Sequence, residues 1–226
     1  ELESLNADDQ ACARLSSELD AYARHYQDKA GELSQLRQAA AGRLASAVEG
    51  EIQRLGMPGG RFSIELRPSA HDEPHPHGLE QVELRVSANP GQPLKPLAKV
   101  ASGGELSRIS LAIQVITAQT SRVPTLVFDE VDVGIGGPTA EVVGQLLRRL
   151  GERGQVLTVT HLPQVAAQGH HHLFVHKARG SDATRTAVAH LQDRERIEEI
   201  ARMLGGVDLT AESLAHARKM VSTAQS

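Results

Sequence analysis

Apolar side chains in the first part of the chain recur at a helical spacing. Between Cys12 and Leu33, apolar or semi-apolar positions lie three or four residues apart, covering 21 residues in six steps, or 3.5 residues per step. This period is typical of a coiled-coil seam, where the apolar stripe of one helix packs against a second helix. We predict a long helix over residues 5–55 that forms one half of a coiled coil. The alternative is a solvated amphipathic helix that lies on its own domain.

Alternation replaces the helical period after a glycine-rich break at residues 56–60. Apolar and polar residues alternate over residues 62–66 and again over residues 82–86, which predicts two half-buried strands paired as a hairpin. The connection at 68–78 carries three histidines between prolines, and a metal site is conceivable there. Because neither a cysteine nor a fixed helical spacing supports such a site, we predict a flexible surface loop.

Segments with helical and with strand-like patterns then alternate along the chain. Residues 105–120 and 139–150 have helical apolar spacing, whereas residues 125–128 and 155–160 are continuous apolar or β-branched runs. Such runs are typical of strands buried on both faces of a parallel sheet, here joined by a right-handed crossover. We therefore predict an α/β fold with a mostly parallel sheet and flanking helices. Polar residues at the carboxyl ends of both strands meet at the edge where open α/β sheets bind ligands.

The end of the chain adds two predicted strands and two predicted helices. The strands fall at residues 173–176 and 186–191, and the amphipathic helices at residues 193–204 and 210–221. The histidine triplet 170–172 invites a metal-site interpretation. Consecutive strand residues point to opposite faces, so we predict that the triplet is exposed to solvent instead.

Composition and charge exclude several classes of protein. The 226 residues are 40% hydrophobic and 23% charged, a globular mixture without a signal peptide or an apolar run near the roughly 20 residues of a membrane span. A single cysteine, Cys12, excludes an internal disulfide and fits a reducing, cytosolic setting. The net charge of −4 shows no bulk basic footprint for nucleic acid. Arg148, Arg149 and Arg153 cluster near a helix end, where we predict a solvated helix face.

The start of the helix at residues 105–120 is the first candidate site. Ser102 is a good N-cap residue, and Glu105 three positions later is the partner of a capping box. A helix N-terminus favours an anion, and Gly103 and Gly104 have no side chain to keep a phosphate away. The alternative is an ordinary capped helix after a loop.

Carboxylates at the end of the first parallel strand are the second candidate site. Asp129 can hold Mg²⁺, which takes few protein carboxylates and keeps several waters. Glu130 can orient or deprotonate a water for attack on a phosphorus atom. His161, at the end of the neighbouring strand, can donate a hydrogen bond to that phosphate. The alternative is that the acidic pair forms only a cap or a turn.

The order of these motifs resembles the carboxy-terminal half of an ABC-type ATPase head. Residues 102–105 resemble the signature motif, residues 125–130 the Walker B strand, the Asp132 region the D-loop, and His161 the switch histidine. The flanking residues, together with residues 200–206, resemble the RecN family of bacterial SMC-like proteins in DNA double-strand-break repair. The resemblance covers residue 95 to the end, and the leading helix matches the position of a descending coiled-coil arm.

This resemblance implies roles for the candidate residues. Ser102, Gly103, Gly104 and Glu105 would belong to the part of the site that contacts the γ-phosphate of ATP on the opposite head of a dimer. Asp132 would lie at the seam between the two heads.

The acidic pair and the histidine would carry the chemistry that the resemblance implies. Asp129 would serve Mg²⁺, Glu130 would be the base for water, and His161 would sense the γ-phosphate. The expected cofactors are therefore ATP and Mg²⁺.

No G-x-x-x-x-G-K-[ST] P-loop occurs in the chain, whereas in this family it lies in an amino-terminal segment beyond the coiled coil. We expect residues 1–55 to be the arm and residues 56–226 to be the carboxy-terminal half of a head. The chain begins at Glu1 without Met, which suggests a piece of a longer protein. Alone, it should hydrolyse little or no ATP and, with an exposed sheet edge, should dissolve poorly or self-associate.

The expected partners are the amino-terminal half of its own head, a second head in an ATP-sandwiched homodimer, and DNA, in a cytoplasmic, nucleoid-associated setting without a membrane. Two other functions remain open. A transporter nucleotide-binding subunit is disfavoured by the long leading helix and the missing P-loop. A non-catalytic coiled-coil scaffold or DNA-bridging module with an ABC-like fold is disfavoured because a scaffold needs neither Glu130 nor His161.

Overall fold

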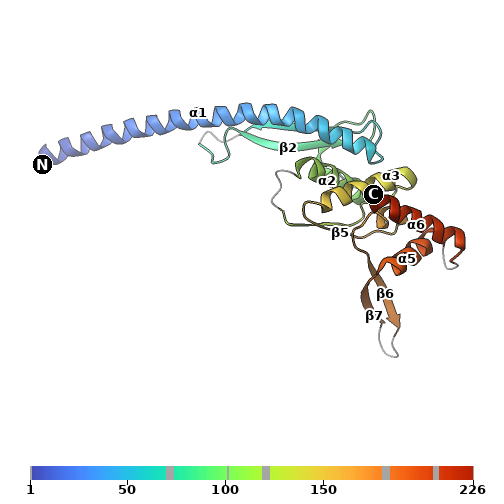
Figure 1. Cartoon of the computed structure of the whole chain (residues 1–226). Helices are drawn as coiled ribbons and strands as arrows, with labels where there is room; N and C mark the ends of the chain where they lie inside the picture. The colour runs from blue at the N-terminus through green and yellow to red at the C-terminus, as the bar shows by residue number, and fades with distance from the viewer. Residues whose placement is uncertain are drawn as a thin grey trace.

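A single long helix opens the molecule and projects beyond the rest of it (Figure 1). In the computed structural model this helix, α1, spans Leu2–Arg54, which confirms the long helix predicted from the apolar spacing. Side chains of the predicted coiled-coil seam, Leu15, Leu19 and Tyr22, are 56%, 68% and 74% exposed, so the seam is uncovered over this part of α1. The structure describes residues 2–69, 74–100, 102–118, 123–179, 184–205 and 209–225.

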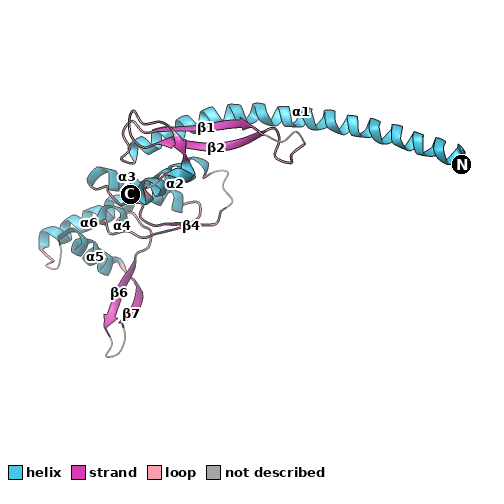
Figure 2. Ribbon diagram, turned by 180° about the vertical axis from the view of Figure 1, so that it is seen from behind, coloured by secondary structure: helices cyan, strands magenta, loops and turns pink. Residues whose placement is uncertain are grey.

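An antiparallel hairpin lies along the second half of α1 (Figure 2). Its strands are β1 (Arg61–Pro68) and β2 (Glu80–Ser87), as the alternating pattern predicted. A short third strand, β3 (Lys95–Pro96), pairs with the end of β2 and leads into the 3₁₀ helix η1 (Leu97–Lys99). We expected irregular backbone there because of Pro96. An edge strand tolerates proline because the missing N–H is not needed for the ladder.

The α/β part follows in the predicted order. Helix α2 (Gly103–Thr117) is followed by strand β4 (Thr125–Phe128), helix α3 (Gly137–Gly151) and strand β5 (Gln155–Thr158). The two strands pair in parallel, which confirms the predicted strand–helix–strand unit. The helix predicted to reach residue 120 ends, as far as it is described, at Thr117, and residues 119–122 lie outside the described part.

One face of this strand pair is uncovered, in contrast to the prediction that both faces are buried. Phe128 is 5% exposed, whereas Val127, Leu157 and Val159 are 68%, 44% and 63% exposed. The main core of the described residues combines the end of α1, the hairpin, α2 and α3 with the buried side of β4 and β5. Continuous apolar strands indicate two covered faces. Within the described residues, this chain covers only one of them.

The last elements form a second hairpin and a helix pair. After the short helix α4 (Pro163–Ala166), strands β6 (Leu173–Arg179) and β7 (Thr184–His190) form an antiparallel hairpin that projects from the body (Figure 1). Helices α5 (Asp193–Gly205) and α6 (Ala211–Gln225) then pack on each other around a small core of their own. Helix α4 was not predicted. No helix in the described part of the chain is both long and apolar enough to cross a membrane.

Candidate functional site

The N-terminus of α2 has the cap that the sequence predicted. The Ser102 hydroxyl accepts a hydrogen bond of 3.3 Å from the backbone N–H of Glu105, and Ser102 itself has extended backbone. Gly103 and Gly104 are the first two residues of the helix. The first-turn N–H groups of a helix have no partner within the helix. This end of α2 therefore has the polarity that attracts an anion.

Both carboxylates predicted at the end of β4 are exposed. The Glu130 N–H donates a 2.9 Å hydrogen bond to Oδ1 of Asp129, and the Ser107 hydroxyl donates a 2.8 Å bond to the Asp129 carbonyl. The second bond ties α2 to the end of the strand. Mg²⁺ is held by few protein carboxylates and keeps several waters, so an exposed aspartate at this position fits that ion.

Glu130 has an unusual backbone conformation. Its φ of 57° makes it the non-glycine residue with positive φ in the described part of the chain. This region is sparsely populated for side chains with a Cβ atom and often marks a functional position. Its carboxylate lies against the start of α2, where a Cβ atom at Gly103 would collide with Oε2 of Glu130. The predicted base and the predicted signature glycine are therefore neighbours in one chain.

A buried arginine joins α2 to the loop after Glu130. The Arg108 guanidinium is 6% exposed and donates a 2.8 Å hydrogen bond to the carbonyl of Val133. Burial lowers the pKa of Arg108. A Cβ atom at Gly104 would lie 3.0 Å from the Val133 carbonyl, so the helix and the loop are in close contact there. The start of α2 and the loop after β4 are thus held together as one unit.

Asp132 and His161 are also brought together. The Asp132 side chain is 2% exposed. Its Oδ2 accepts hydrogen bonds from the Thr160 hydroxyl and, at 3.2 Å, from the His161 N–H. The same oxygen lies 3.5 Å from Nδ1 of His161, whose side chain is 69% exposed.

The structure therefore brings the sequence-predicted residues to three adjoining segments, namely the start of α2, the loop after β4 and the end of β5. We call them together the signature–strand site, defined by residues 102–105, 129–133 and 160–161. The arrangement offers a helix N-terminus for an anion, an exposed carboxylate for a cation and a second carboxylate beside them. These are groups that phosphoryl transfer uses.

Sequence reasoning missed three members of this neighbourhood, Ser107, Arg108 and Thr160. Arg108 had a detectable signal, because it lies one helical turn after Gly104 and next to Ile109 on the buried side of α2. Ser107 and Thr160 had none, since a hydroxyl on a helix or at a strand end is ordinary until its acceptor is known.

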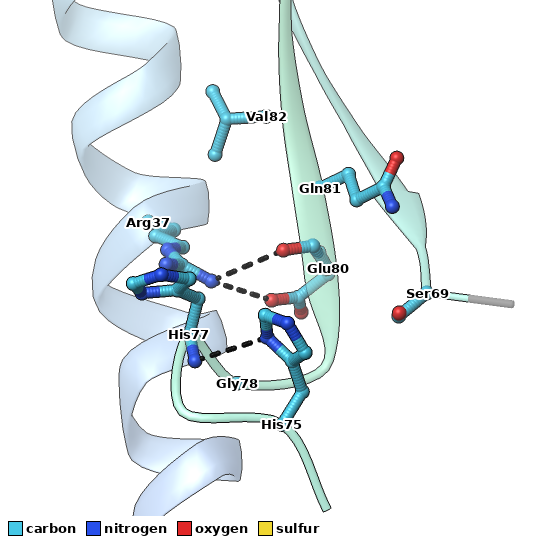
Figure 3. Close-up of a pocket in the computed structure, with 8 residues that line it drawn as sticks. All are labelled: Arg37, Ser69, His75, His77, Gly78, Glu80, Gln81 and Val82. Carbon is cyan, nitrogen blue, oxygen red and sulfur yellow. Dashed lines mark hydrogen bonds and ion pairs between the residues drawn. The ribbon is translucent and has the colours of Figure 1, made fainter. Parts of the chain in front are cut away.

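A hollow lies elsewhere, between α1, the end of β1 and the start of β2 (Figure 3). It has a volume of about 390 Å³, and the Arg37 guanidinium on its wall lies 3.4 Å from the Glu80 carboxylate. His75 and His77 also line it, and the His75 N–H donates to the Tyr26 hydroxyl. The second half of the predicted surface loop is thus tied to α1. His71 lies outside the described residues.

The other candidate sites show no metal centre in the part of the chain that the structure describes. Among the described residues, no group of three or more His, Cys, Asp or Glu side chains is placed to hold a metal ion. His170 and His171 are exposed as predicted. His172 is half-buried, and burial, followed by the nearby Arg196 charge, lowers its pKa. Arg149 and Arg153 are exposed as predicted, whereas the half-buried Arg148 donates to the Gln168 carbonyl.

Comparison with solved structures defines the class of fold. The chain resembles an SMC head domain with a coiled coil and joint from Pyrococcus yayanosii, with a TM-score of 0.51 and 19% identity. The match covers 73% of this chain and 29% of that one. A long helix followed by α/β elements with parallel strands is thus the fold of an SMC-type ABC head, which confirms the predicted fold class. No protein-family model matches the chain.

Comparison with curated proteins narrows this class to one family. The chain is 48% identical over 225 residues to the DNA repair protein RecN of Xylella fastidiosa (strain 9a5c), covering 100% of this chain and 40% of the relative. The corresponding Vibrio cholerae protein is 48% identical over 225 residues, with coverage of 99% and 40%. The Haemophilus influenzae protein is 50% identical over 195 residues, with coverage of 86% and 35%. The chain is thus similar over its whole length to the carboxy-terminal part of RecN proteins, as its motifs predicted, and spans about 40% of the length of the first two relatives.

Proposed function

We propose that this chain supplies the carboxy-terminal half of an SMC-like ATPase head that acts in DNA double-strand-break repair. The observation that carries the proposal is the position of Glu130, which has an uncommon φ of 57° and an exposed carboxylate that lies against Gly103. A strained non-glycine residue at the end of a strand suggests chemistry more than packing. In this proposal residues 1–55 form the arm and residues 56–226 belong to the head.

The acidic pair and the histidine carry the proposed hydrolysis. Asp129 would hold Mg²⁺, which neutralises phosphate charge when bound. Glu130 would take a proton from the attacking water, and a positioned base is worth about 10²–10⁴-fold in rate. His161 would donate a hydrogen bond to the transferred phosphate, for which its 69% exposed side chain is accessible.

The start of α2 would serve a second head. Ser102 and Gly103 are exposed at the helix N-terminus, where a γ-phosphate bound to another copy can approach the backbone N–H groups. Gly104 and Glu105 hold this end of α2 through close packing and the cap. ATP would therefore lie between two heads in a homodimer.

The amino-terminal half of the same head is the proposed covering for the open face of β4 and β5. Val127, Leu157 and Val159 expose apolar surface there, and relatives have about 60% of their length beyond the part matched here. We use the term full-length form for this chain joined to the amino-terminal part that its relatives carry. That form would bind DNA and would be cytoplasmic and associated with the nucleoid.

ATP turnover of the chain, alone and mixed with the amino-terminal part of the full-length form, tests this proposal. We expect steady-state turnover only in the mixture, because the chain has no P-loop to hold the phosphates. Turnover by the chain alone would contradict the split-head interpretation. A mixture that forms a folded complex without turnover would favour the non-catalytic scaffold or DNA-bridging module.

Replacing Gly103 by alanine should separate folding from activity. The added methyl group would collide with the end of the flexible Glu130 side chain, which can move, so the fold should persist. Displacing the base by about 1 Å can cost about 100-fold in rate. We expect that loss of turnover in the full-length form, with the thermal unfolding midpoint unchanged.

The matched control is Gly50→Ala, also a helical glycine, where a Cβ atom would meet nothing within 4 Å. It should leave turnover unchanged. Wild-type turnover in Gly103→Ala would show that the contact between Gly103 and Glu130 has no role in hydrolysis.

A further inference from the structure

A second hollow lies between the ends of α3 and α6, and none of its lining residues belongs to the signature–strand site. We call it the α3–α6 hollow. It has a volume of about 310 Å³, and most of its lining side chains are polar. They come from the last turns of α3 and α6 and from the segment that follows α4. The polar members are Gln145, Arg148, Arg149, Glu152, Gln168 and Thr223.

Gln168 is a buried polar side chain on the wall of this hollow. The residue is 7% exposed, and its side-chain amide forms no hydrogen bond with any residue that the structure describes. A Cβ atom at Gly144 would lie 2.7 Å from Cγ of Gln168, so the aliphatic part of the side chain packs tightly on α3. The amide is not fully enclosed, and the residue lines the hollow, so the amide faces into it. Burying a polar group without a partner is costly, and a ligand held in the hollow would supply the missing partner.

The ionisable groups of the α3–α6 hollow favour an anion. Among its lining side chains, Arg148 and Arg149 accompany one acidic residue, Glu152, which gives these groups a net charge of +1. Neither arginine forms an ion pair with another described residue. Arg148 donates one hydrogen bond of 2.9 Å to the Gln168 carbonyl, which leaves other N–H groups of its guanidinium for a ligand.

The positive charge of Arg148 also acts on the groups around it. Burial, followed by the charge of Arg148, lowers the pKa of both His170 and Arg196. A neighbouring positive charge disfavours a second one. An anion bound beside Arg148 would offset this repulsion.

The hydrogen-bonding groups on the walls fit a phosphate. Guanidinium groups only donate and bind phosphate oxygens in a paired geometry, and the Gln145 and Gln168 amides and the Thr223 hydroxyl can donate as well. These donors come from three segments of the chain. The tetrahedral oxygens of a phosphate can meet donors on several sides, whereas the two oxygens of a carboxylate lie in one plane. None of the described lining residues is aromatic, so a nucleobase would have no ring to stack on.

We propose that the α3–α6 hollow binds a phosphate group through Arg148, Arg149 and the Gln168 amide. The group belongs to the backbone of DNA or to a free phosphate, and two arms of the experiment separate these sources. The site is independent of ATP hydrolysis, because the hollow shares no residue with the signature–strand site.

The first variant is Gln168→Met in the full-length form. Methionine nearly keeps the volume of the side chain and removes the amide, so no hydrogen bond between described residues is lost. Replacing an unpaired buried polar group by an apolar group of similar shape is neutral or stabilising. We expect weaker phosphate binding with an unfolding midpoint equal to or above that of the wild type. A purely structural role of the amide would lower the midpoint instead.

The second variant, Arg149→Gln, removes a charged donor from an exposed position. Calorimetry with inorganic phosphate, with ADP present to fill the nucleotide site, should show an affinity about 10- to 100-fold lower, the usual contribution of a hydrogen bond to a charged group. Glu152→Gln removes the acidic group and should tighten binding. The matched control is Arg153→Gln, at an exposed arginine that does not line the hollow, and it should leave the affinity unchanged.

Fluorescence anisotropy of a labelled DNA duplex, measured at several salt concentrations, tests the DNA backbone as the source. If the backbone occupies the hollow, Arg149→Gln will weaken DNA binding and reduce the slope of log K against log salt by about 0.9, whereas Arg153→Gln will not. Weaker binding of inorganic phosphate with unchanged DNA binding would assign the hollow to a free phosphate.

Wild-type affinity for both probes in Gln168→Met and Arg149→Gln would overturn the inference. Equal losses in Arg149→Gln and Arg153→Gln would overturn it as well, because they would reflect the general charge of the surface. Failure of the proposed function is seen in a different measurement, the turnover of ATP, on which these binding experiments do not depend.

Discussion

Replacing Glu130 by glutamine is expected to lower ATP turnover of the full-length form by about 10²–10⁴-fold, the usual contribution of a positioned general base. Glutamine keeps the size of the side chain and the same backbone cost at a φ of 57°, but it cannot take a proton from water. Because Asp129 and the start of α2 are unchanged, ATP binding and ATP-dependent association of heads should persist. Steady-state turnover and light scattering with ATP measure the two effects separately.

The matched control is Glu141→Gln on the exposed side of α3, where the Glu141 carboxylate accepts a weak 3.4 Å bond from Gln145. That variant should turn over ATP like the wild type. If Glu130→Gln keeps turnover within about twofold, Glu130 is not the base, because even a weak general base contributes about 10²-fold. The role of its strained backbone would then have to be sought in folding.

Local patterns explain why much of this molecule was predictable from sequence. The helix α1 follows from a regular apolar spacing, and the cap at Ser102 follows from a hydroxyl three residues before a glutamate. The strand–helix–strand unit follows from the order of apolar runs. In each case the determining residues are neighbours in sequence, so no knowledge of distant contacts is needed.

The features that escaped prediction depend on distant contacts. The Asp132 carboxylate is buried because Thr160 and His161 supply donors from another strand, which no local pattern reports. Likewise, Val127 lies in a continuous apolar run of the sequence, but its side chain is exposed in the structure. Sequence specifies that a strand needs two covered faces; it does not say which chain segment covers them.

Two buried arginines are a further feature that depends on distant contacts. Arg108 and Arg196 are 6% and 5% exposed, yet their partners are backbone carbonyls rather than carboxylates. Burial lowers the pKa of both guanidinium groups. A buried cation without an acidic partner is tolerated only where fixed carbonyl dipoles replace water. Both arginines therefore mark positions where loops next to the signature–strand site are held rigidly.

Replacing Arg196 by methionine should loosen the segment that follows His161. The Arg196 guanidinium donates to the carbonyls of Ala166 and Ala167 at 3.4 and 2.9 Å, and further to those of Gly169 and His170. These carbonyls lie at and beyond the end of α4, where helix carbonyls lack partners within the helix and favour a cation. Methionine has a similar length but removes all of these hydrogen bonds, and in the described part of the chain only the Ala166 carbonyl keeps another one, at 3.3 Å from the Gly169 N–H. We expect a local destabilisation of about 3 kcal/mol, or about a hundredfold in the opening equilibrium.

Hydrogen exchange of residues 163–170 in the full-length form measures this change directly, because amides in a segment that opens locally exchange in proportion to its opening equilibrium. Arg194→Met is the matched control on the same helix, where the exposed arginine pairs with the exposed Glu198 at 2.8 Å. An exposed ion pair of this kind contributes about 0–1 kcal/mol, so exchange in that variant should stay close to that of the wild type. Equal exchange in Arg196→Met and Arg194→Met would show that the carbonyls of α4 do not depend on Arg196. A hundredfold increase in exchange confined to the Arg196 variant would mean that α5 anchors the segment that follows His161. The helix pair α5–α6 would then stabilise one side of the signature–strand site.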